Sequence, residues 1–326
     1  MKLVFFGTPA FAVPVLQAVH SAGHEILAVV TQPDRPRGRK KVLTPPEAKV
    51  CAQVLGLSVL QFERIKRPEA VQALASLDAD VWVTAAYGQI LSKELLDLPP
   101  KGVINAHASL LPAYRGAAPV NWCLIHGETK TGVTTMYTDV GVDDGDMILQ
   151  QEECIRPEDT AESLLGRLSC IAAELMVQTL ALVEKGQAPR TPQDEQLATR
   201  QPMLSKQDGA LDFSQRAEAV GNRTRGVTPW PGAFAALDGQ IYKFAEPYTA
   251  EGCGVPGTIL TADEKNGLLI ACGEGAIGFK QIQAPGKKKM DARDFLRGHH
   301  LDTSKRFGAV SYTHLQVFRR FHGRPG

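Results

Sequence analysis

Asn105 and His107 are the two residues whose types and spacing are best suited to chemistry. They end an apolar segment, residues 102–107, that has the pattern of a strand, and side-chain alternation puts positions 105 and 107 on the same face. In open α/β sheets, ligands bind beyond the carboxyl ends of the strands, where this pair would lie. An isolated Asn-x-His pair more often satisfies nearby backbone groups, so the surrounding segments decide between these interpretations.

Three surrounding features favour acyl transfer. The pair is followed by a Ser-Leu-Leu-Pro segment at 109–112 and then by an aromatic residue, a cation and a glycine at 114–116. An acidic turn at 143–146 follows a predicted strand, and the opening strand turns into a helix at Gly7. An amide, a histidine and a carboxylate can together polarise a carbonyl, hold an oxyanion and move a proton. Those are the requirements of acyl transfer.

The elements that must position these residues alternate between short β-branched runs and helical patterns. This order predicts an α/β domain with a parallel sheet covered by helices on both faces. A capping box from Thr44 to Glu47 predicts where the second helix starts. The predicted strands are 3–6, 26–31, 81–85, 103–107 and 133–137, and the predicted helices are 11–22, 44–55 and 160–184.

The second half of the chain has a different organisation. Residues 187–205 are rich in Pro, Gln and Thr without a periodic pattern, which predicts a linker. Short runs at 241–244, 257–260, 268–271 and 277–282 are separated by Gly, Pro and Asp turns, which predicts a small barrel or sandwich. We therefore expect domains at 1–186 and 206–308, followed by an unassigned tail at 309–326. Trp230, between two prolines, is expected to pack in the second domain.

The composition fits a globular cytoplasmic protein. Of 326 residues, 44% are hydrophobic and 22% charged, with a net charge of +1, which allows two cores of ordinary size. The six cysteines form no C-x-x-C pair, so no zinc or redox site is predicted, and no metal is expected. Gly7-Thr8-Pro9 interrupts the apolar start too early for a signal peptide, and no stretch is expected to cross a membrane.

Two blocks resemble the active-site signature of the 10-formyltetrahydrofolate-dependent formyltransferases: N-A-H-A-S-L-L-P-A-Y-R-G-A-A-P at 105–119 and D-V-G-V-D-D-G-D at 139–146. Further blocks resemble the members of that family that act on methionyl-tRNA: F-F-G-T-P, T-Q-P-D-R-P-R-G-R, A-A-Y-G-Q-I-L, P-W-P-G-A and A-P-G-K-K-K-M. The resemblance extends from residue 1 to about residue 308, and the tail beyond it departs from the family pattern.

The resemblance implies a Rossmann-like domain followed by an OB-like β-barrel domain. It implies that Asn105, His107 and Asp143 are the catalytic group, with Asp143 orienting His107. It further implies that 10-formyltetrahydrofolate is the formyl donor and that the acceptor is methionyl initiator tRNA. We expect a monomer, and the acidic turn at 143–146 has too few accompanying ligands to predict a metal. The segment that would line the folate pocket consists of Ser109, Leu110, Leu111 and Pro112.

The loop from Gln32 to Lys49 carries a run of cations. Such a run is usually a solvated surface. However, this loop leaves the carboxyl end of strand 26–31, on the same sheet edge as the candidate catalytic residues, where cations could contact tRNA phosphates. The candidate nucleic-acid-binding residues are Arg35, Arg37, Arg39, Lys40 and Lys41 of this loop and Lys287, Lys288 and Lys289 of the second domain.

Three alternatives remain open from the residues alone. A nicotinamide dehydrogenase would use Gly7 and Asp34, but positions 7–12 lack the G-x-G-x-x-G fingerprint. A formyltransferase of the same family could act on a different amine, because the core site handles the formyl group and not the acceptor. A non-enzymatic RNA-binding protein would use the basic loop and the barrel, but it would have no purpose for the candidate catalytic group.

Overall fold

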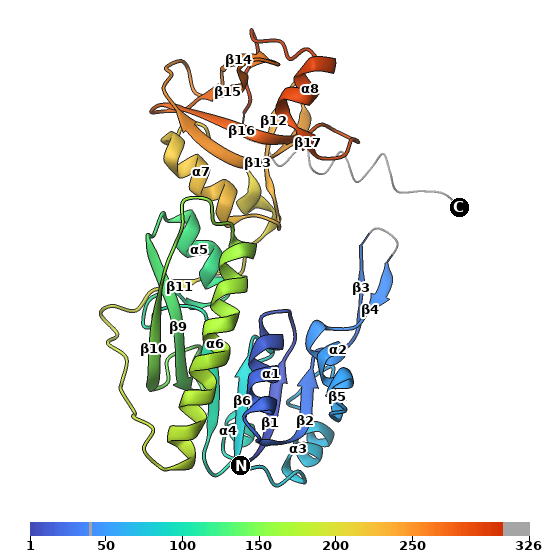
Figure 1. Cartoon of the computed structure of the whole chain (residues 1–326), viewed down its shortest axis with the longest axis vertical. Helices are drawn as coiled ribbons and strands as arrows, with labels where there is room; N and C mark the ends of the chain where they lie inside the picture. Colours follow the sequence, from blue (N-terminus) through green and yellow to red (C-terminus); the bar gives the residue numbers. More distant parts are fainter. Residues whose placement is uncertain (39–40, 309–326) are drawn as a thin grey trace. The chain divides into compact units, whose positions relative to one another are not determined.

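The computed structural model describes residues 1–38 and 41–308, which form two compact units (Figure 1). Unit 1 consists of Met1–Pro119, Lys130–Cys154 and Ser163–Pro202. Among the described residues, unit 2 consists of Val120–Thr129, Ile155–Glu162 and residues 203–308. The predicted tail at 309–326 and two of the loop cations, Arg39 and Lys40, lie outside the described residues.

Unit 1 contains a seven-stranded sheet in the order β10-β9-β7-β6-β1-β2-β5. The pairs β1/β2, β1/β6, β2/β5 and β6/β7 are parallel, which confirms the predicted Rossmann-like arrangement. The edge differs from the prediction, because β9 runs antiparallel to β7 and β10 runs antiparallel to β9. The strand bounds are β1 Lys2–Gly7, β2 Glu25–Thr31, β5 Val59–Gln61, β6 Val81–Ala85, β7 Val103–His107, β9 Lys130–Tyr137 and β10 Met147–Cys154.

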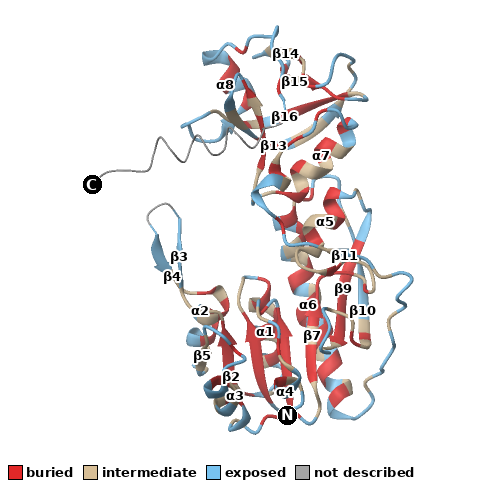
Figure 2. Ribbon diagram, turned by 180° about the vertical axis from the view of Figure 1, so that it is seen from behind, coloured by how far each residue is buried: buried red, intermediate tan, exposed pale blue. Residues whose placement is uncertain are grey.

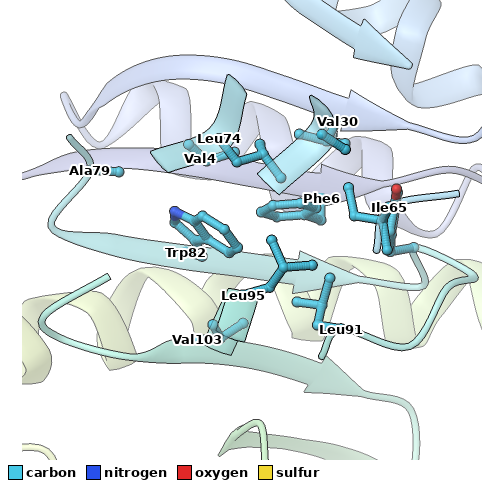
Figure 3. Packing of buried hydrophobic residues seen from close by; sticks show 12 residues of the cluster. Val4, Phe6, Val30, Ile65, Leu74, Ala79, Trp82, Leu91, Leu95 and Val103 are labelled. Carbon is cyan, nitrogen blue, oxygen red and sulfur yellow. The ribbon is translucent and has the colours of Figure 1, made fainter. Parts of the chain in front are cut away.

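Helices cover both faces of this sheet. In Figure 1, α1 (Ala12–Ser21) and α6 (Ala161–Glu184) lie in front of the strands. The opposite face packs against α3 (Pro68–Ala75) and α4 (Lys93–Leu96) through a buried cluster that is built around Phe6 and Trp82 (Figure 3). The rings of these two residues lie 4.9 Å apart, and burial of such apolar area is the main contribution to the stability of the sheet.

The basic loop forms a β-hairpin of β3 (Arg35–Arg37) and β4 (Val42–Thr44), in which β3, Val42 and Leu43 are exposed (Figure 2). The helix that follows, α2 (Glu47–Val54), starts three residues later than predicted. The predicted capping box is wrong: the Thr44 hydroxyl donates to the carbonyl of Val42, and Glu47 binds Arg37. Thr44 and Glu47 therefore bind residues of the hairpin and do not cap the helix.

Unit 2 contains an antiparallel sheet in the order β12-β13-β16-β15-β14, with β17 paired to β16. Residues 306–308 join its two edges: Gly308 exchanges both backbone hydrogen bonds with Ala236 of β12, and Arg306 bridges to Thr258 beside β14. This closure gives the barrel-like second domain that the sequence predicts. The bounds are α5 Pro119–Ile125, η1 Lys206–Gly209, α7 Ala217–Gly226, β12 Ala233–Leu237, β13 Gln240–Ala250, β14 Ile259–Asp263, β15 Gly267–Ala271, β16 Ala276–Gln283, β17 Met290–Asp291 and α8 Ala292–Gly298.

Two expectations need correction. Trp230 does not pack fully in the second domain, because 52% of its surface is exposed. One helix among the described residues, α6, is long and apolar enough to cross a membrane, although the sequence analysis expects no such stretch. Half of its apolar window is buried inside the protein, and core helices pass the same test.

Candidate active site

Asn105 and His107 lie on the last three residues of β7, at the carboxyl edge of the parallel strands, as predicted. Asn105 is fixed by Thr84 of β6, whose hydroxyl donates to its Oδ1 at 2.7 Å. Because Oδ1 is already occupied, the Nδ2 amide is the donor that Asn105 presents to a ligand. An amide held in this way is suited to stabilise an oxyanion.

His107 is almost completely buried and has partners on both ring nitrogens. Its Nε2 lies 3.0 Å from the carbonyl oxygen of Tyr114, which can only accept, so Nε2 carries a proton. Its Nδ1 lies 3.6 Å from Oδ2 of Asp143. The same Oδ2 accepts a hydrogen bond of 2.9 Å from the amide of Gly116. The structure therefore brings His107 and Asp143 together, and Asn105 lies two residues before His107 on the same strand.

Asp143 reaches His107 by a path that the sequence does not indicate. The amide of Thr138 donates to the carbonyl of Val103, so the turn after β9 leaves beside the start of β7. Asp143 nevertheless contacts His107, at the other end of β7, so the turn folds back along the strand. Asp143 has a φ of +54°, a left-handed conformation that Asp tolerates better than most residues.

The segment after Arg190 packs against this turn and against the loop that follows β7. Two residues of it form β11 (Arg200–Gln201), which pairs with β8 (Arg115–Gly116). Arg115 is fully buried and donates to Gln193 at 2.9 Å and to both carboxylate oxygens of Glu195 at 2.7 and 3.1 Å. The segment predicted as a linker thus supplies partners to the first signature block.

The Ser-Leu-Leu-Pro segment is held by internal contacts. Ser109 and Leu111 are buried, and the Ser109 hydroxyl donates to the carbonyl of Ala113. Thr134 accepts from the amide of Leu111 and donates to the carbonyl of Ser109, at 3.1 and 2.7 Å. Leu110 and Pro112 are partly exposed, so contact with a ligand through a side chain is open to them and not to Leu111. The assignment of this segment to folate stays a prediction.

A cavity of about 290 Å³ lies beside the turn after β9. Tyr137, Asp144 and Asp146 line it together with Lys93 and Arg190. Asn105, His107 and Asp143 do not line it, so this cavity is not the place where the candidate catalytic side chains meet.

Those predicted nucleic-acid-binding residues that the structure describes lie on exposed surfaces of both units. Arg35 pairs with Glu63 at 2.6 Å and Arg37 pairs with Glu47, while Lys41 and Lys287–Lys289 are exposed. Each arginine would have to exchange its carboxylate for a phosphate in order to bind nucleic acid. Exposed pairs of this kind are weak, so the exchange costs little.

Asp34 does not serve the role that a dehydrogenase would give it. Lys49 donates to both of its oxygens at 2.8 and 2.9 Å, and Gln61 donates to Oδ1 at 2.9 Å. These bonds, that from Lys49 first, hold the pKa of Asp34 below its usual value. Asp34 therefore fastens the base of the hairpin to α2 and β5, and its oxygens are already engaged.

Sequence reasoning missed two residues that support the catalytic group, Thr84 and Gln193. Thr84 lies on a buried strand, and strand alternation offers no reason to single out one threonine there. Gln193 lies in an aperiodic segment that carries no pattern at all. Among residues 1–38 and 41–308, no group of three or more His, Cys, Asp or Glu side chains is arranged to hold a metal ion.

Two solved structures share the fold of this chain. HypX from Aquifex aeolicus in complex with tetrahydrofolic acid has a TM-score of 0.62 at 17% identity over 94% of this chain, which spans about half (50%) of the HypX chain. An N-formyltransferase from Helicobacter canadensis has a TM-score of 0.64 at 15% identity, with 86% of this chain and 98% of that chain covered. At these identities the likeness shows the fold alone.

Sequence similarity shows the family. The profile described as formyl transferase matches residues 1–180, and that described as formyl transferase, C-terminal domain, matches residues 203–300. A methionyl-tRNA formyltransferase of Geotalea uraniireducens (strain Rf4) is 47% identical over 92% of this chain and 96% of its own. One of Solibacter usitatus (strain Ellin6076) is 47% identical over 94% of this chain and 99% of its own. The chain therefore belongs to the formyl transferase family.

Proposed function

We propose that this protein transfers the formyl group of 10-formyltetrahydrofolate to the α-amino group of methionyl initiator tRNA. The observation that carries the chemistry is the meeting of the two signature blocks, with Asp143 Oδ2 3.6 Å from His107 Nδ1 and 2.9 Å from the Gly116 amide. The choice of acceptor is supported by relatives named methionyl-tRNA formyltransferase that match this chain over nearly their full lengths.

In the proposed reaction, the methionyl amine attacks the formyl carbon and forms a tetrahedral intermediate. The Nδ2 amide of Asn105, directed by Thr84, donates to the oxyanion. The Nε2–H of His107 is the second donor, and it must exchange the Tyr114 carbonyl for the formyl oxygen. Collapse of the intermediate breaks the bond to N10 of the folate, which takes up a proton as the amine loses one.

Asp143 orients His107 in this scheme. Its carboxylate faces Nδ1, so it fixes which ring nitrogen is turned toward the substrate. The Gly116 amide holds the carboxylate in place. None of these steps requires a metal.

The co-substrate and the acceptor use different parts of the chain. Residues 109–112 remain our proposal for the folate pocket, with Leu110 and Pro112 as its partly exposed members. The hairpin cations and Lys287–Lys289 are proposed to contact tRNA phosphates, which would make affinity fall with salt. We propose a cytoplasmic monomer with a catalytic domain at 1–186, a linker at 187–205 and an OB-like tRNA-contacting domain at 206–308.

A competition between acceptors tests the proposal. Purified protein is given 10-formyltetrahydrofolate with methionyl initiator tRNA, an amino-sugar nucleotide or a purine-pathway ribonucleotide amine. We expect formylation of the methionyl-tRNA at a kcat/KM at least about a hundredfold above that for either small amine, since only the tRNA can use the basic surfaces. A higher kcat/KM for a small amine would show that the enzyme is a formyltransferase with a different acceptor.

A further inference from the structure

We propose that Gln193 is a positioning residue. It holds the turn after β9, residues 138–146, so that Asp143 stays against His107. This inference rests on the proposed function for its kinetic consequence but not for its structural claim. The Nε2 amide of Gln193 donates to the backbone carbonyls of Asp143 and Gly145, at 2.9 and 2.8 Å. These two hydrogen bonds go from the Gln193 side chain to backbone atoms of the turn, and not to the Asp143 carboxylate or the His107 ring.

Gln193 is itself fixed by the first signature block. Its Oε1 accepts from Nε of Arg115 at 2.9 Å, and Arg115 is fully buried. The remaining guanidinium nitrogens of Arg115 bind Glu195, two residues further along the same segment. With both ends of its amide engaged, Gln193 connects residue 115 of one block to residues 143 and 145 of the other.

The turn needs such an external support because its backbone is under constraint. Asp143 has a left-handed φ of +54°, and a Cβ at Gly145 would lie 1.9 Å from the carbonyl oxygen of Tyr137. Residues in sparsely populated conformations persist only where the surrounding structure determines them. The turn must also run back along β7 to reach His107.

Arg190 and Thr191, which precede Gln193, bind residues at both ends of the same turn. The guanidinium of Arg190 lies 3.7 Å from the centre of the Tyr137 ring and pairs with Asp146 at 3.3 Å. Thr191 exchanges two backbone hydrogen bonds with Met147, of 2.9 and 3.0 Å. Residues 190–195 thus lie along the turn. Gln193 is the member of this segment that binds Asp143, the residue that faces His107.

The test compares Gln193→Met with Gln196→Met in the full-length protein. Both changes remove an amide of similar size from the same segment, but the Gln196 side chain is exposed and lies outside these contacts. Hydrogen exchange of the peptides covering 114–117 and 139–147 is measured first. We expect exchange at least about tenfold faster in Gln193→Met, with exchange in the β6 and β7 peptides unchanged, and wild-type exchange throughout in Gln196→Met.

Kinetics with 10-formyltetrahydrofolate and Met-tRNA provide the second measurement. Gln193→Met should lower kcat by about ten- to a hundredfold and leave both KM values within about twofold, because misplacement of a catalytic group affects the chemical step. In an Asp143→Asn background the same change should have no further effect on kcat. An additive loss in the double variant would overturn the positioning role, since Gln193 would then act independently of Asp143.

The two measurements separate the inference from the proposed function. Wild-type exchange of both peptides in Gln193→Met would contradict the inference, whatever the enzyme formylates. Absence of formyl transfer by the wild-type protein would contradict the proposed function, and the exchange data would still decide whether Gln193 holds the turn.

Discussion

The carboxylate of Asp143 and the amide of Gly116 form a hydrogen bond of 2.9 Å that joins the two signature blocks. Gly116 has a φ of +94°, and a Cβ there would lie 2.7 Å from the carbonyl oxygen of Gln201. A glycine is therefore required at position 116, where β8 pairs with β11. The carboxylate that faces His107 is thus anchored by backbone, and backbone anchoring gives it one defined position.

Replacement of His107 or Asp143 should slow catalysis strongly without unfolding the protein. We expect His107→Asn and Asp143→Asn each to lower kcat by at least about a hundredfold, because both remove a group that acts in the transition state. Folate binding, measured by equilibrium titration, should stay near that of the wild type. A His107→Asn variant with wild-type turnover would refute the assignment.

The second prediction concerns the closure of the barrel in unit 2. Phe307 is buried against Phe213, Tyr242 and Phe244, in the segment that joins the two sheet edges. Phe307→Ala should lower the free energy of unfolding of unit 2 by about 3–5 kcal/mol, as for other buried aromatic truncations. The matched control is Trp230→Ala, which should cost less than about 1 kcal/mol because this residue is half exposed. Equal losses, measured by denaturant unfolding, would contradict the closure.

The third prediction is a pH dependence at Glu195. The hydrogen bond from Arg115 is the main cause that lowers the pKa of Glu195 from its usual 4.5, against a smaller opposing effect of desolvation. A lowered pKa means that the stabilisation is fully present above about pH 4.5 and is lost as the pH falls through the folded-state value.

Melting curves from pH 3 to 7 can test this dependence. Glu195→Gln should melt below the wild type at pH 6, and the gap should close as the pH falls below about 4.5. The gap should be small, because the Glu195 side chain is 70% exposed and solvent screens the pair. Glu174→Gln, at an exposed position on α6, is the control for loss of a surface carboxylate. A gap for Glu195→Gln that does not change with pH would exclude the ion pair as its cause.

The fourth prediction concerns the hairpin. Neutralising Arg39, Lys40 and Lys41 together should weaken Met-tRNA binding and flatten its salt slope by about two to three units, while folate binding stays intact. A separate variant with Lys287, Lys288 and Lys289 neutralised shows whether unit 2 contributes in the same way. If affinity and slope both stay at wild-type values in the hairpin variant, the loop is a solvated surface only.

The sequence was sufficient for the main elements and for the pair at the end of β7, because apolar strands and their alternation leave a local pattern. The direction in which two strands pair leaves no local pattern in the sequence. The antiparallel β9 and the return path of the turn to Asp143 were therefore not foreseen. Gln193 acts through backbone carbonyls far away in sequence, which no local pattern can indicate. The Leu111 backbone amide likewise binds Thr134, a residue far away in sequence that the local pattern does not indicate.

The most direct test of the central claim is the formation of formyl-methionyl-tRNA. Wild-type protein is incubated with methionyl initiator tRNA and 10-formyltetrahydrofolate carrying a labelled formyl group, and the label on the α-amine of methionine is followed with time. We expect catalytic transfer over many turnovers, with at least about a hundredfold less in His107→Asn. Label that stays on the folate while the wild-type protein is folded and binds both substrates would contradict it.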